Sequence, residues 1–375
     1  MTAEPAELAS LSVSLSQHAP IALDVSFCCM AGQVTALFGR SGSGKTTILR
    51  CIAGLHPPRT GRIACNGEVW LDTERHIDIP PHRRAVGYVF QDYALFPHMT
   101  AVENVTAALG HLSRGQRRRR AQQLLCLVHL DDYGQRRPAE LSGGQRQRVA
   151  VARALARDPK VLLLDEPFSA VDRETRGALY RELEDLRRSL TLPILLVTHD
   201  FDEITRLADS LIVLEAGHAV AQGPLGDLTG RTDVALLADY FDPCSIFDAT
   251  VGKHLSDRGL TQLSFAGGNL LVPLLGLPEG DRLRIRIYAR EVILAVEQPA
   301  GISVHNALSG RVARIDHDHR TPSAMVGIAL AEATLLARVT QHAVVALGLS
   351  EGSPVLALIK SVGIDVPGLR MTNLE

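Results

Sequence analysis

Residues 39–46 read GRSGSGKT, a spacing of glycines, lysine and threonine that suits the binding of phosphate groups. The apolar stretch VTALF precedes it and the helical stretch TILRCIAGL follows it. Backbone N–H groups of such a loop point at phosphate oxygens, and the start of the helix adds its positive dipole end. The alternative, a glycine turn that caps an ordinary helix, is disfavoured by this strand–loop–helix context. The predicted phosphate-binding residues are Gly39, Arg40, Ser41, Gly42, Ser43, Gly44, Lys45, Thr46 and Thr47.

Two acidic residues end the apolar stretch VLLLDEP at 161–167 and supply the second half of such a site. Lys45 would neutralise the outer phosphates, and the hydroxyl of Thr46 would bind Mg²⁺. Asp165 would hold Mg²⁺ directly or through water, which leaves Glu166 to orient and polarise an attacking water. Two solvated acids at a strand end are the alternative, and the pairing with Lys45 argues against it.

Polar residues also follow two other apolar strands. His199 ends LLVTH, and Gln91 ends GYVFQ. Because the C-terminal ends of parallel strands converge on a ligand, we expect His199 at the γ-phosphate and Gln91 near Mg²⁺ and the water. The predicted catalytic residues are therefore Glu166, His199 and Gln91, and the predicted metal-site residues are Thr46, Asp165 and Gln91.

A helical stretch from Arg146 onward is preceded by ELSGG, in which two adjacent glycines follow a serine. Ser142 alone would be a sufficient N-cap, and glycine is costly to order in a helix. Bare amides at a helix start, with the hydroxyl of Ser142, predict a second anion site at Ser142, Gly143 and Gly144. Since the chain already has one phosphate loop, this second site would serve a nucleotide on another copy of the fold.

Strands and helices alternate up to about residue 230, with a hairpin turn at Asn66–Gly67 and a mainly helical stretch over about 92–158. Beyond about 240, strand-like segments dominate, and residues 277–295 echo 349–364, which suggests two related small β units. We predict an α/β domain over 1–235 and a β domain over 236–375.

The composition excludes several classes of function. A net charge of −2 and a pI near 6.7 do not indicate a protein that binds nucleic acid. The cluster of positive charge at Arg117–Arg120 is typical of a solvated helix face. The six scattered cysteines fit reduced thiols rather than a disulfide framework or a zinc site. No secretory signal and no apolar stretch of spanning length is present, so a membrane role would need a partner.

Together GRSGSGKT, Gln91, LSGGQ, LLLDEP, SAVD and His199 resemble the ATP-binding subunits of ABC transporters over about residues 12–230. The resemblance implies a P-loop NTPase fold with a helical subdomain, and a head-to-tail homodimer that sandwiches two ATP molecules with Mg²⁺. Gln145 would join Ser142–Gly144 at the partner's nucleotide, and Asp172 would lie in a loop crossing the interface. The implied partners are a transmembrane permease, touched by the region after Gln91, and indirectly an oxyanion-binding protein outside the membrane. The implied location is peripheral, on the cytoplasmic face of the cell membrane.

The family usually has an aromatic residue near the N-terminus that stacks on adenine, but residues 12–23 contain no Phe, Tyr or Trp, which leaves His18 as the substitute. Residues 66–98 resemble the molybdate-importer branch of this family. ISVHNALSGRV (302–312) and residues 335–362 resemble its small OB-like molybdate-binding β-barrel, best matched over 300–366. The implied oxyanion contacts are Ser303, His305, Asn306, Lys360 and Ser361. His305 stands where the family has arginine, so we expect weaker or pH-dependent binding.

The resemblance leaves alternatives open. The barrel could serve only as a dimer-forming or spacer domain. The same ATPase could drive another cargo, such as sulfate, tungstate, iron or polyamine, because its motifs do not touch cargo. A soluble ABC ATPase of translation or DNA repair is disfavoured, since such proteins usually carry two cassettes or a long coiled coil.

Overall fold

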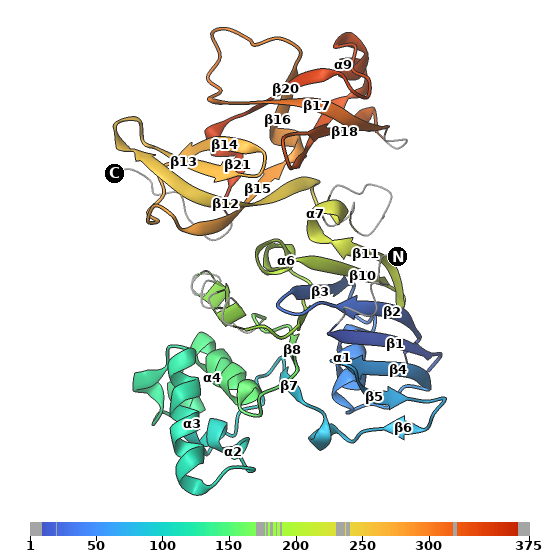
Figure 1. Cartoon of the computed structure of the whole chain (residues 1–375), viewed down its shortest axis with the longest axis vertical. Helices are drawn as coiled ribbons and strands as arrows, with labels where there is room; N and C mark the ends of the chain where they lie inside the picture. The colour runs from blue at the N-terminus through green and yellow to red at the C-terminus, as the bar shows by residue number, and fades with distance from the viewer. Residues whose placement is uncertain are drawn as a thin grey trace. The chain divides into compact units, whose positions relative to one another are not determined.

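The computed structural model describes residues 10–19, 21–169, 177, 179–180, 183–184, 186–187, 190–229, 237, 241–317 and 321–366. The chain forms two compact units, Met1–Pro224 and Leu225–Glu375, shown in Figure 1. The boundary predicted after residue 235 lies farther along the chain than this division. Among the described residues, no helix has the length and apolar character needed to cross a membrane.

An eleven-stranded sheet runs through the first unit, in the order β6-β5-β4-β1-β2-β11-β10-β3-β9-β8-β7. At the β4–β5 turn, Asn66 and Gly67 have φ values of 47° and 78°, which confirms the predicted hairpin. The strands are β1 Leu11–Gln17, β2 Leu23–Cys29, β3 Val34–Gly39, β4 Thr60–Cys65, β5 Glu68–Asp72, β6 Ile77–Asp78, β7 Val86–Val89, β8 Val161–Asp165, β9 Ile194–Val197, β10 Ser210–Glu215 and β11 His218–Pro224.

Strands β3, β9, β8 and β7 are parallel neighbours. Every residue of β3, β8 and β9 is buried, as expected for strands covered on both faces. Helix α1 (Lys45–Ala53) packs Ile48 and Ile52 into the same core as these strands. The C-terminal ends of the parallel strands therefore lie along one edge of the sheet, beside the start of α1.

The predicted helical subdomain is confirmed. It contains α2 (Ala101–Ala107), α3 (Arg114–Leu127) and α4 (Gly143–Leu155), which pack on one another. Figure 1 shows these three helices grouped at the β7 end of the sheet. The unit also contains the helical segments η1 Pro81–Arg83, η2 Asp131–Tyr133, η3 Pro138–Glu140 and α6 Phe201–Leu207.

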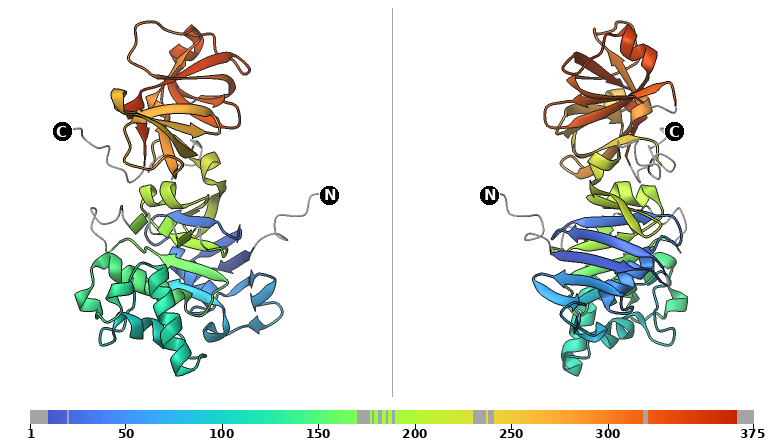
Figure 2. Two further views of the ribbon diagram at one scale, coloured as in Figure 1. Left: turned by 60° about the vertical axis from the view of Figure 1, so that its left-hand side comes forward. Right: turned by 90° about the vertical axis from the view of Figure 1, so that its right-hand side faces the viewer.

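The second unit is built from two five-stranded sheets, β14-β13-β12-β15-β21 and β16-β20-β17-β18-β19 (Figure 2). Its elements are α7 Leu225–Leu228, β12 Cys244–Leu255, η4 Ser256–Arg258, β13 Leu260–Phe265, β14 Gly268–Pro273, β15 Arg282–Tyr288, η5 Ala289–Glu291, β16 Val292–Ala295, β17 Asn306–His317, β18 Ser323–Ala329, β19 Thr334–Thr340, α9 Gln341–Ala346, β20 Pro354–Ile359, η6 Ser361–Gly363 and β21 Ile364–Asp365.

The sequence echo corresponds to a real structural repeat. Each half ends in a strand, a 3-10 turn and a short strand: β15–η5–β16 in the first half and β20–η6–β21 in the second. The short last strands are exchanged, because β16 pairs with β20 and β21 pairs with β15. One apolar core spans both halves, so the two β units are a single intertwined domain rather than two separate ones.

Candidate functional site

The loop between β3 and α1 has the geometry of a phosphate cradle. Gly44 caps α1 with a φ of 97°, and a Cβ at this position would lie 2.5 Å from Leu23 Cδ2, so only glycine fits. The side chain of Ser43 is buried, and its Oγ has no hydrogen-bond partner among the described residues. A buried hydroxyl of this kind calls for a ligand or water, which fits a phosphate oxygen.

Lys45 is held at the same loop. Its Nζ donates hydrogen bonds to the carbonyl oxygens of Gly39 and Arg40, at 2.8 and 2.9 Å. Burial lowers the pKa of Lys45, while the carboxylates of Glu166 and Asp165 act in the opposite direction. Lys45 therefore lies within electrostatic reach of the two carboxylates that end β8.

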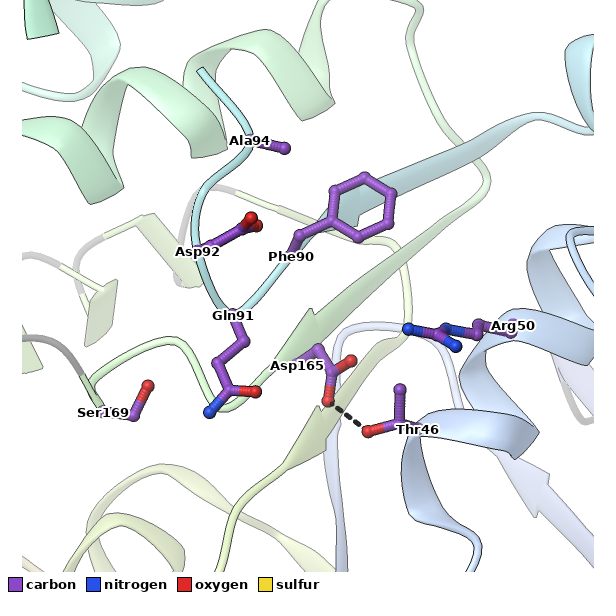
Figure 3. Close-up of a pocket in the computed structure, with 8 residues that line it drawn as sticks. All are labelled: Thr46, Arg50, Phe90, Gln91, Asp92, Ala94, Asp165 and Ser169. Carbon is purple, nitrogen blue, oxygen red and sulfur yellow. Dashed lines mark hydrogen bonds between the residues drawn. The ribbon is translucent and has the colours of Figure 1, made fainter. Parts of the chain in front are cut away.

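Asp165, the last residue of β8, is buried, and both of its carboxylate oxygens are bound. Thr46 Oγ1 donates to Oδ1 at 3.0 Å, and the hydroxyl of Tyr88 donates to Oδ2 at 3.0 Å (Figure 3 draws the first contact). Burial raises the pKa of Asp165, and these two hydrogen bonds oppose the rise. A carboxylate beside a hydroxyl supplies the hard oxygen ligands that Mg²⁺ prefers.

The side chain of Glu166, which follows β8, contacts residues that follow the two neighbouring strands, β7 and β9. Its Oε1 lies 3.2 Å from His199 Nδ1, and its Oε2 accepts a hydrogen bond from Gln91 Nε2 at 3.2 Å. Glu166 has a φ of 45°, an unfavourable value for a non-glycine residue, and Ser169 Oγ donates to its carbonyl at 2.9 Å. This turn directs the carboxylate to the two side chains that follow β7 and β9.

A pocket of about 750 Å³ opens beside these residues. Figure 3 shows the side chains of Thr46, Gln91 and Asp165 around it. Sequence reasoning missed Arg50, although it follows Thr46 by four residues and so lies on the same face of α1. It also missed Tyr88, on β7, and Phe90, the residue after β7, which alternate with the buried Gly87 and Val89. The lining residues are Thr46, Arg50, Phe90, Gln91, Asp92, Ala94, Asp165 and Ser169.

Residues 142–145 lie at the start of α4, in the helical subdomain. Ser142 and Gln145 cap their own helix, since Ser142 Oγ accepts from Gln145 N and Gln145 Oε1 accepts from Ser142 N. A Cβ on Gly144 would lie 3.0 Å from Leu179 Cδ1, so packing within the chain gives one reason for this glycine. Gly143 is half-buried, and Asp172 lies outside the described residues.

Comparison with known proteins identifies the chain's relatives. Residues 22–169 match the family described as ABC transporter, and residues 302–366 match the TOBE domain. A molybdenum import ATP-binding protein ModC of Methylococcus capsulatus is 42% identical over 344 residues, which cover 91% of this chain and 95% of that protein. A protein of the same name from Pseudomonas aeruginosa is 39% identical, with 91% and 95% covered. The chain belongs to the family of molybdenum import ATP-binding proteins.

Among solved structures, a dimeric ATP-binding cassette bound to ADP and Pi after hydrolysis is 30% identical. The match covers 57% of this chain and 98% of the solved chain, with a TM-score of 0.48.

In the TOBE domain of this family member, one of the five predicted oxyanion contacts has another role. Asn306 is buried, and its Nδ2 donates to the carbonyl oxygens of Leu271 and Ile359 while its Oδ1 accepts from Leu271 N. Both amide protons are used, so Asn306 has none left to donate to an oxyanion. Its role here is to join β14, β17 and β20, which corrects the prediction of a ligand contact.

The other four residues remain candidates. Ser303, His305 and Lys360 are exposed, whereas Ser361 is buried and its Oγ has no hydrogen-bond partner among the described residues. Asn306, the first residue of β17, pairs with Ile359, the last residue of β20. His305 and Lys360, which are next to them in the chain, therefore lie at the same end of the sheet. The orphaned hydroxyl of Ser361 is compatible with a bound oxyanion.

Proposed function

We propose that this protein hydrolyses ATP in the presence of Mg²⁺ and thereby drives molybdate import through a separate membrane-spanning permease. The observation that carries the proposal is the position of Glu166. Its carboxylate contacts both Gln91 and His199 and directly follows Asp165, which Thr46 contacts. The names of the relatives, molybdenum import ATP-binding proteins, support the assignment of the cargo.

Each side chain of the site has its own role in ATP hydrolysis. Lys45 exchanges the carbonyls of Gly39 and Arg40 for the outer phosphate oxygens of ATP. Thr46 and Asp165 would hold Mg²⁺, which supplies charge stabilisation to the transferring phosphoryl group. Glu166 orients and polarises the water that attacks the γ-phosphorus, with Gln91 fixing its carboxylate and His199 facing the γ-phosphate.

A second copy of the chain would complete each ATP site. Ser142, Gly143, Gly144 and Gln145 would bind the partner's nucleotide, with Asp172 at the interface. The positive dipole end at the start of the 13-residue α4, with the backbone N–H groups of Gly143 and Gly144 outside the capping box, suits an anion. Closure on ATP and opening after hydrolysis would then move the permease.

The permease would contact the segment after Gln91, where Asp92 and Ala94 line the open pocket. With such a contact the protein would act at the cytoplasmic face of the membrane, with an external oxyanion-binding protein as an indirect partner. In the TOBE domain, Ser303, His305, Lys360 and Ser361 would bind molybdate and damp transport when the anion accumulates inside. This chain has histidine at residue 305, so that binding should be weaker or pH-dependent.

The decisive test is ATP-dependent uptake by the permease complex in vesicles, with the wild type and Glu166→Gln. We expect Glu166→Gln to retain ATP binding and to lose phosphate release and molybdate uptake by about 10³-fold, because the general base is removed. Competition with sulfate and tungstate in the same vesicles identifies the cargo. Unchanged uptake in Glu166→Gln would contradict the proposed mechanism, and preference for sulfate would reassign the cargo.

A further inference from the structure

Tyr88 contacts Asp165 from the neighbouring strand. Strand β7 pairs in parallel with β8, and the phenol hydroxyl donates to Asp165 Oδ2 at 3.0 Å. The other oxygen, Oδ1, is contacted by Thr46 Oγ1. The two oxygens of one carboxylate thus have different partners, one on the phosphate-loop helix and one on the sheet.

The phenol ring is itself held in place. It stacks on Phe90 with ring centroids 4.2 Å apart and an interplanar angle of 27°. Arg50 lies on the face of α1 that carries Thr46. Its positive charge opposes the rise that burial causes in the pKa of both Tyr88 and Asp165. Tyr88 is therefore a fixed donor, and it is half-buried next to a buried carboxylate.

We propose that Tyr88 is a positioning residue, which orients Asp165 so that Oδ1 faces Thr46 and is presented to Mg²⁺. The inference rests on the proposed function of Asp165 and Thr46 as the metal-binding pair. A carboxylate at a strand end rotates about its terminal torsion, because that torsion has a broad energy well. A hydrogen bond from a stacked phenol to one oxygen removes this freedom and fixes the direction of the other oxygen.

Phenylalanine at position 88 would keep the ring and its stacking but remove the donor. Oδ2 would then lack its protein partner, and the carboxylate would rotate or recruit water. The matched control is Tyr93→Phe, because the buried hydroxyl of Tyr93 donates to the carbonyl of Pro167 at 3.2 Å, in the same region of the fold.

The test is binding of Mn²⁺, a paramagnetic probe of the Mg²⁺ site, to the full chain with ADP, followed by electron paramagnetic resonance. Calorimetry of ADP without metal gives the second measurement. We expect Tyr88→Phe to weaken Mn²⁺ binding about tenfold and to leave metal-free ADP affinity within about twofold. Tyr93→Phe should match the wild type in both measurements, and Asp165→Asn should lose most of the Mn²⁺ affinity.

Three outcomes would overturn the inference in distinguishable ways. Wild-type Mn²⁺ affinity in Tyr88→Phe, with loss in Asp165→Asn, would leave the metal site intact and remove the role of Tyr88. An equal loss of metal-free ADP affinity in Tyr88→Phe would show that Tyr88 only maintains the fold. Equal Mn²⁺ binding by the wild type and Asp165→Asn would contradict the proposed metal-binding pair itself.

Discussion

The phosphate loop of the first unit and the η6 turn of the TOBE domain share one feature and differ in another. Each contains a buried serine hydroxyl without a hydrogen-bond partner among the described residues, Ser43 in the first and Ser361 in the second. Around Ser43, a buried lysine and two carboxylates are already held in place. Around Ser361, the candidates His305 and Lys360 are exposed to water.

This difference suggests how strongly each site binds. Charges that are buried and preorganised interact more strongly than exposed ones, which water and salt screen. We therefore expect tight, specific nucleotide binding in the first unit and weaker anion binding in the TOBE domain. Four sets of variants test this contrast.

The largest effect is expected from removing the two lysines. Lys45→Ala should lower ATP affinity about 100-fold, because a buried charge-assisted contact to phosphate is lost. Lys360→Ala should lower molybdate affinity by only about tenfold or less, since its ammonium is solvated. Calorimetry on the full chain measures both. An equal loss at the two sites would contradict the proposed difference in preorganisation.

Asn306→Ala should destabilise the TOBE domain by about 2–4 kcal/mol, because the N–H and C=O groups of Leu271 lose their amide partner. Hydrogen exchange of the β14 and β20 amides in the full chain would report this loss locally. Exposed Ser303→Ala is the control and should leave exchange unchanged. If Asn306→Ala weakened only anion binding, the structural role assigned to Asn306 would be wrong.

Ser361→Ala should have the opposite pattern. Removing an unpaired buried hydroxyl leaves stability unchanged or raises it by up to about 1 kcal/mol, while anion affinity falls several-fold. Ser43→Ala should behave in the same way toward ADP. Thermal unfolding and calorimetry, measured on the same samples, separate the two effects. A clear loss of stability in Ser361→Ala would mean that its hydroxyl has a structural partner.

The smallest effect concerns Asp165 in the nucleotide-free protein. Since burial raises its pKa, the folded chain binds the proton more tightly than the unfolded chain, and the ionised carboxylate destabilises the fold at neutral pH. Asp165→Asn should therefore raise the melting temperature by about 2 °C at neutral pH. The gain should shrink as the pH falls through the raised pKa, because wild-type Asp165 becomes protonated. A gain independent of pH would contradict this account.

Local features of the sequence were sufficient for the phosphate loop, the Asn66–Gly67 hairpin, the alternation of strands and helices and the helical stretch after residue 92. Each of these depends on residues that are consecutive or one turn apart, so the pattern and the physics coincide. The echo between 277–295 and 349–364 likewise predicted two related β units.

The sequence predicted Gln91, Glu166 and His199 in one site, but the tertiary structure alone decided which atoms of distant residues are in contact. Glu166 contacts Gln91 and His199 across 75 and 33 residues of chain, and the partner strand selected for β8 brings Tyr88 to Asp165. The exchange of β16 and β21, and the use of Asn306 to join strands, also follow from pairing at long sequence separation. Such contacts leave no periodic signal, because their energy comes from burial and hydrogen bonding between elements rather than within them.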